Sequence, residues 1–181
     1  SSASSPGDQA SAPFTVTASA SDSLSGVENV ELFYRYSANG STWESWTSFG
    51  VDTDGSDGWS WSFNAPDGRG YYQFYTIARD TSGNVESQPD NRDVQIKFGY
   101  SVSVSASPSG GGSVSASLTV ALTGETVTVS ATAASGYSFS NWSGYLSGST
   151  NPTSFSMPAS NVSITANFTK RMVSPGYNIG G

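Results

Sequence analysis

Three acidic side chains, Asp52, Asp54 and Asp57, stand close together in the run Asp-Thr-Asp-Gly-Ser-Asp-Gly. Calcium binds about six to eight oxygens, and carboxylates at alternate positions can converge on one ion. A helix-loop-helix calcium loop would need a bidentate Glu at its twelfth position, which is Phe63 in this sequence. Two interpretations stay open: a calcium loop, or a solvated hairpin turn, which the Asp and Gly residues favour.

Side chains that perform acid-base or nucleophilic catalysis are scarce. The chain has no His and no Cys, which excludes Ser-His-Asp and Cys-His catalysis and zinc sites built from these residues. A glycosidase needs two carboxylates across a cleft, yet residues 99–169 hold a single charged side chain, Glu125. The sequence therefore predicts a protein that is not an enzyme and has no catalytic residues.

Aromatic side chains form a second candidate site, because flat rings stack on sugars and recur at binding hot spots. Trp59 and Trp61 share a strand face with Phe63, which is typical of a core. The strand that carries Tyr72 is apolar on both faces, because residues 71, 75 and 77 lie on the face opposite to Tyr72. This pattern indicates that the second face contacts a neighbouring domain, a subunit, or a long Lys or Arg side chain. Core packing remains the alternative for the tryptophans. The candidate ligand or partner contacts are Trp43, Trp46, Tyr71 and Tyr75.

Four Asn-x-Ser/Thr sequons occur, as expected of a surface glycoprotein but also by chance in a chain rich in Ser and Thr. The one in a predicted turn, Asn39-Gly-Ser41, is the best candidate. The candidate glycosylation sites are Asn39, Asn141, Asn161 and Asn167.

The composition excludes several classes of partner. The net charge is −7, with seven Lys and Arg in 181 residues, so no basic face exists for nucleic acid or for an anionic membrane. No apolar stretch approaches the roughly 18 residues of a spanning helix, which predicts no direct membrane insertion. Only 12% of the residues are charged, whereas 54 are Ser or Thr. Such a hydroxyl-rich surface favours an extracellular or cell-surface location.

The hydrophobic pattern alternates with period two throughout, and no window shows a helical stripe. Short strands separated by turn clusters predict an all-β fold with a sandwich in the first half. Acidic residues are concentrated before Phe98, which places a domain boundary there. The predicted organisation is a polar tail or linker at 1–12, domains at 13–98 and 99–169, and a second tail at 170–181.

Two acidic residues, Asp22 and Asp80, fall in separate turn clusters of the first domain. We expect them to lie near each other at one end of the sandwich. Capping of backbone N–H groups is the favoured role, and a metal site is the second interpretation.

Residues 13–98 resemble a bacterial or archaeal immunoglobulin-like surface domain. The specific feature is the ending Tyr-x-Phe-x-x-x-Ala-x-Asp-x-x-Gly-Asn, from Tyr72 to Asn84. Its Gly83 and Asn84 tolerate the positive φ of a tight turn. The resemblance implies a β-sandwich without catalytic activity.

Residues 99–169 resemble the divergent B-repeat of internalin-type bacterial proteins. The resemblance rests on the runs Gly110-Gly-Gly-Ser-Val114, Gly124-Glu-Thr-Val127, Gly136-Tyr-Ser-Phe-Ser-Asn-Trp142-Ser-Gly144, Met157-Pro158 and Val162-Ser-Ile-Thr-Ala-Asn-Phe168. It implies a small β-rich module with a β-grasp-like shape, used as a stalk or spacer.

Two functions follow as hypotheses. The first is a structural module of a prokaryotic surface protein, such as a stalk, surface-layer or filament subunit. Its tails would add strands to other copies or dock on their own domains. The second is an adhesion module that binds carbohydrate or protein through exposed aromatics. The expected partners are copies of the chain, neighbouring domains of a larger surface protein, or carbohydrate. No cofactor is expected apart from calcium.

Overall fold

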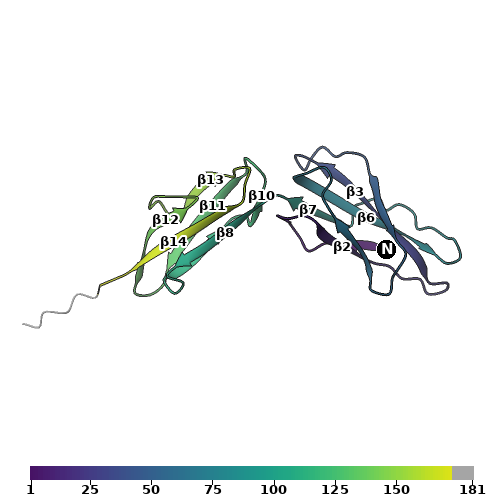
Figure 1. The fold of residues 1–181 in the computed structure, drawn as a ribbon, viewed down its shortest axis with the longest axis horizontal. Coiled ribbons are helices and arrows are strands. Elements are labelled where there is room, and N and C mark those ends of the chain that lie inside the picture. Colours follow the sequence, from purple (N-terminus) through teal and green to yellow (C-terminus); the bar gives the residue numbers. More distant parts are fainter. Residues whose placement is uncertain (173–181) are drawn as a thin grey trace, which may run out of the picture. The chain divides into compact units, whose positions relative to one another are not determined.

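The computed structural model describes residues 1–172, and every regular element in them is a β-strand (Figure 1). The all-β prediction is therefore confirmed for these residues. The chain divides into two compact units, Ser1–Tyr100 with Val120–Leu122, and Ser101–Thr119 with the chain from Thr123 onward. The predicted tail at 170–181 lies outside the described residues from position 173.

Seven strands build the first domain in two sheets. One sheet has the order β1-β2-β5 and the other β4-β3-β6-β7. The long strands β3 and β6 form the centre of the second sheet, where Leu32 pairs with Thr76 and Tyr34 with Phe74. The strands are β1 (Ser2–Ser4), β2 (Phe14–Ser19), β3 (Val27–Ser37), β4 (Thr47–Asp52), β5 (Trp59–Phe63), β6 (Gly70–Asp80) and β7 (Val94–Phe98).

Strict alternation directs one face of each strand inward. In β5, Trp59, Trp61 and Phe63 are buried and the two serines between them are exposed, because successive strand residues point to opposite faces. Phe63 is fully buried and meets Tyr72 from the opposite sheet edge-on, with ring centroids 5.2 Å apart. The aromatic rings of the two sheets thus interlock to form the core.

One polar atom in this core lacks a partner. Thr76 is 1% exposed, and its Oγ1 has no hydrogen bond among the described residues. Its backbone N–H donates to the Asp93 carboxylate. A buried hydroxyl without a partner lowers stability, because its hydration is lost and not replaced.

Residues 1–12, for which the sequence predicts a polar tail, are part of the first domain. Strand β1 pairs antiparallel with β2, and Ala3 opposite Ala18 is buried. The Asp93 carboxylate accepts the Ala3 N–H at 2.7 Å. Backbone pairing and a side-chain acceptor hold this segment. Its strand was not predicted, because its residues are small and polar and show no alternating apolar pattern.

The same segment also reaches the other sheet. The Gln9 N–H donates to the Lys97 carbonyl, and the Gln9 carbonyl accepts the Gly99 N–H. The Asp8 carboxylate accepts the Lys97 N–H at 2.7 Å. Residues 1–12 therefore cover an edge strand in each of the two sheets and satisfy their backbone groups.

The second domain also consists of two sheets. Strand β14 lies between β8, to which it is parallel, and β12, to which it is antiparallel, while β11 lies between β13 and β9. Its strands are β8 (Tyr100–Ser107), β9 (Gly112–Ala116), β11 (Thr126–Ala133), β12 (Tyr137–Gly144), β13 (Thr153–Ser156) and β14 (Val162–Lys170), and the short β10 (Val120–Ala121) is grouped with the first unit.

Buried residues of both sheets form the second core. Val127 and Val129 of β11 are fully buried, as is Ile164 of β14. The sheets approach so closely that a Cβ on Gly112 would lie 2.5 Å from the Phe168 ring, so only glycine fits there. The described residues contain no helix, so this domain lacks the helix across a sheet that defines a β-grasp, and two sheets take its place.

Candidate functional site

The four-stranded sheet of the first domain has an apolar second face, which we call the outer face. It carries the residues of β3 and β6 that alternate with the core positions, among them Phe33, Arg35, Gln73 and Tyr75. The structure brings the predicted contacts Trp46, Tyr71 and Tyr75 to this face, and Trp43 joins them through Arg35.

Three aromatic rings pack against one another at the centre of the outer face. Phe33 and Tyr75 are cross-strand partners and stack with ring centroids 4.9 Å apart. Trp46, from the segment before β4, meets Tyr75 edge-on at 4.5 Å. Tyr75 is therefore only 3% exposed, and burial, with a smaller effect of Glu31, raises the pKa of its hydroxyl.

Arg35 closes the face from above the rings. Its Cζ lies 4.5 Å from the Trp46 centroid and 5.2 Å from that of Trp43. Its Nε donates to Gln73 Oε1 at 2.9 Å, and Gln73 Nε2 donates to Gln95 Oε1 at 2.7 Å. The guanidinium is fixed by hydrogen bonds while it covers the two indoles.

Lys97 covers the remaining tyrosine of the face, because its Nζ lies 5.6 Å from the Tyr71 centroid. The aromatic side chains of the outer face thus pack against cations and rings of the same domain, which leaves Tyr75 buried and the others half-buried. Of the coverings predicted for this face, the structure shows the long Arg and Lys side chains.

A shallow pocket of about 280 Å³ lies farther along the outer face, and we call it the valine pocket. Its apolar walls are Val51, which is 53% exposed, Val85, which is 60% exposed, and Ile77. Pairing aligns Val51 and Ile77 on either side of Glu31. Sequence reasoning missed this site, because it depends on register across three strands.

The acidic run after β4 does not gather around a metal position. Asp52 accepts the Asp54 N–H with one oxygen and the Ser60 N–H with the other, at 3.0 and 2.9 Å. Asp54 accepts the hydroxyl and the N–H of Ser56, which lower the pKa of its carboxyl. No group of three or more acidic side chains in residues 1–172 is arranged to hold a metal, so the structure does not bring Asp52, Asp54 and Asp57 together as ligands.

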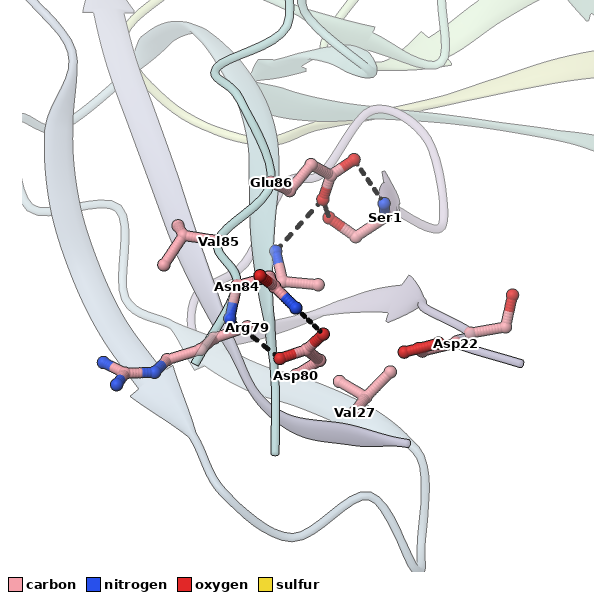
Figure 2. A pocket seen from close by; sticks show the side chains of 10 residues that line it. Ser1, Asp22, Val27, Arg79, Asp80, Asn84, Val85 and Glu86 are labelled. Atoms are coloured by element: carbon pink, nitrogen blue, oxygen red, sulfur yellow. Dashed lines mark hydrogen bonds and ion pairs between the residues drawn. The ribbon is translucent and has the colours of Figure 1, made fainter. Parts of the chain in front are cut away.

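Asp22 and Asp80 lie at one end of the sandwich and cap backbone groups, as the sequence predicts (Figure 2). Asp22 accepts the Leu24 N–H at 2.9 Å, and this bond is the main cause of its lowered pKa. Asp80 accepts the Asn84 N–H at 2.8 Å and the Asn84 Nδ2 at 2.6 Å. The Asn84 side chain is the main cause of the lowered pKa of Asp80.

A pocket of about 360 Å³ adjoins these carboxylates. Figure 2 shows Glu86 above Asp80 and Asn84, with its carboxylate accepting the Ala78 N–H at 3.0 Å. Val27 and Ala78 form part of the lining. The carboxylates at this end are used to hold turns and the β6 backbone.

The four sequons lie in different environments. Asn39 follows β3 and is exposed, and Asn161 is exposed just before β14. Asn141 and Asn167 pair with each other across β12 and β14. The position of Asn39 outside the strands agrees with the turn that the sequence predicts there.

Comparisons with known proteins give one match for each half of the chain. Residues 2–84 match the family described as bacterial Ig domain, and residues 102–172 match the family described as divergent InlB B-repeat domain. No curated protein and no solved structure matches the chain. Residues 1–172 contain no helix that is long and apolar enough to cross a membrane.

Proposed function

Because the chain consists of a bacterial Ig domain followed by a divergent InlB B-repeat domain, we propose that it serves as a structural spacer in a prokaryotic surface protein. Both domain types are typical of cell-surface modules, and neither belongs to a catalytic family. The finer role, a stalk that separates neighbouring parts of a larger protein, is our proposal.

The observation that carries the proposal is the packing of the aromatic side chains of the outer face against residues of the same domain. A sugar platform needs a free aromatic face, but Arg35 lies over Trp43 and Trp46, and Tyr75 is enclosed by Phe33 and Trp46. These rings stabilise the sheet, as expected of a module that carries load rather than ligand.

The pairing of the N-terminal segment favours the role of a spacer over that of a subunit that polymerises. Its backbone groups pair with β2 and with the residues around Lys97 in the same chain. The segment is therefore paired within its own chain rather than free to add a strand to another copy. Filament or surface-layer assembly would need other contacts.

A second candidate function is adhesion to a protein partner through the valine pocket. The exposed walls Val51 and Val85 and the floor residue Ile77 support it, because grouped apolar side chains at a surface mark interaction sites. Glu31 and Arg79 would form its polar rim.

Two measurements test the proposal. Brief protease treatment of intact producing cells should release peptides of this chain, and light scattering of residues 1–181 should give a monomer at all concentrations. A chain protected until lysis would contradict the surface role, and growth in mass with concentration would contradict the passive spacer. Adhesion would be favoured if the monomer binds to intact cells and the double variant Val51→Ser/Val85→Ser does not.

A further inference from the structure

The four sequons differ in how their carboxamides are used. Asn141 and Asn167 lie inside paired strands, with Asn141 Nδ2 donating to the Trp142 carbonyl at 3.0 Å and Asn167 Nδ2 donating to Ser143 Oγ at 2.9 Å. Both nitrogens are engaged, and the surrounding backbone is held in a sheet ladder. Asn141 is exposed and Asn167 is half-buried, but an enzyme that modifies either nitrogen would have to break its hydrogen bond and reach a backbone held in a sheet.

Asn161 is exposed, but its hydroxyl partner is not beside it. The Asn161 Oδ1 accepts the Ser101 N–H at 2.9 Å. Ser163, the hydroxyl residue of this sequon, already lies in β14 and pairs with Ser103. This carboxamide therefore binds another strand rather than its own sequon.

Asn39 shows a different arrangement. It is exposed in the loop between β3 and β4. Its Oδ1 accepts the Ser41 hydroxyl, the Ser41 N–H and the Thr42 N–H, each at 2.9 Å, and the Ser37 hydroxyl at 3.1 Å. The Asn and the hydroxyl of this sequon are thus in direct contact. Among residues 1–172, Asn39 Nδ2 has no hydrogen-bond partner and is available as a nucleophile.

We propose that Asn39 is the acceptor of an N-linked glycan, transferred from a lipid-phosphate-activated sugar by the glycosylation enzymes of the producing cell. The inference rests on the proposed surface function, since such donors act on exported chains. A bond forms between Asn39 Nδ2 and the sugar C1 while the bond from C1 to the phosphate oxygen breaks. The lipid phosphate leaves, and a transferase base takes one Nδ2 proton.

Hydrogen bonding explains why this carboxamide is suited to the reaction. An amide nitrogen is a weak nucleophile because its lone pair is delocalised into the carbonyl. Four donors on Oδ1 withdraw electron density and make the Nδ2 protons more acidic, so a base removes one more easily. Ser41 supplies two of these four donors.

The position of the loop gives the glycan a structural consequence. A Cβ on Gly40 would lie 3.2 Å from the Tyr71 ring, so the loop packs on a tyrosine of the outer face. A glycan on Asn39 would begin at the rim of that face. It would shield the aromatic cluster from solvent and partners, which suits a spacer.

The test uses the folded chain of residues 1–181, a single-subunit oligosaccharyltransferase of Asn-x-Ser/Thr specificity, and a lipid-diphosphate-linked oligosaccharide. Intact mass and peptide mapping should show one glycan, on Asn39. Ser41→Ala should lose the mass increase although the two backbone donors to Oδ1 remain, and Ser41→Thr should keep it. Asn161→Gln is the matched control and should be modified like the parent.

Two outcomes overturn the inference. In one, the enzyme glycosylates another sequon before Asn39. In the other, the folded chain is not glycosylated, although the same chain is glycosylated after unfolding. Protein isolated from the producing cell distinguishes failure of this inference from failure of the proposed function on which it rests. Protein on the cell surface with a bare Asn39 contradicts the glycan alone. Protein absent from the surface contradicts the spacer, while the result with the isolated enzyme still decides whether Asn39 is an acceptor.

Discussion

The guanidinium of Arg35 lies over the indole of Trp46, 4.5 Å from its centroid, and its Nε donates to Gln73. The two residues cover part of a sheet face that would otherwise face water. This relationship turns aromatic residues that resemble a ligand platform into part of the structure of the domain.

Replacement of this cation should therefore destabilise the first domain. Arg35→Ala loses the contacts with both indoles and the hydrogen bond to Gln73, and we expect a loss of about 1–2 kcal/mol in unfolding free energy. Urea unfolding followed by tryptophan fluorescence measures it. The control is Arg92→Ala at an exposed position, and equal stability of the two variants would show that Arg35 does not hold the face.

Removal of the unpaired hydroxyl in the core should have the opposite effect. Thr76→Val replaces Oγ1 by a methyl group of similar size, and Oγ1 has no partner among the described residues. We expect a gain of about 1 kcal/mol, measured as a shift of the urea midpoint at constant slope. A loss of stability would mean that the hydroxyl has a partner, such as a bound water.

The sequence predicted best what depends on near neighbours. The alternation in β5 predicted the buried Trp61 and Phe63, and the turn residues predicted capping by Asp22 and Asp80. These features need only strand periodicity and local turn chemistry. The Arg35–Trp46 contact and the valine pocket depend on how separate strands pair, so sequence alone could not place them.

The acidic run offers a direct comparison of the two interpretations of its residues. Asp52→Ala should cost about 0.5–1.5 kcal/mol, because the Asp54 and Ser60 N–H groups lose their acceptor. Asp57→Ala should cost much less, and millimolar calcium should not change the Tm of either variant or of the parent. A calcium-dependent rise in the parent Tm that both variants lose would establish a calcium loop.

Acid should weaken the turn held by Asp80. The Asn84 side chain and backbone N–H groups lower its pKa below the ordinary value of 3.8, so the folded state prefers the charged carboxylate. The stabilisation is present above about pH 4 and is lost as the pH falls through the lower, folded pKa. Unfolding free energy measured between pH 6 and pH 2 should fall less in Asp80→Ala than in the parent, and an equal fall in both proteins would contradict this role of Asp80.

The most direct test of the structural role of the outer face is an NMR titration of residues 1–181 with a panel of soluble oligosaccharides. The Arg35 Nε–H signal should already be shifted by the Trp46 ring in the free protein and return toward its usual position in Trp46→Ala. On titration, this signal and the indole N–H signals of Trp43 and Trp46 should not move. Saturable shifts of these indoles with any sugar would contradict the spacer and make the face a binding site.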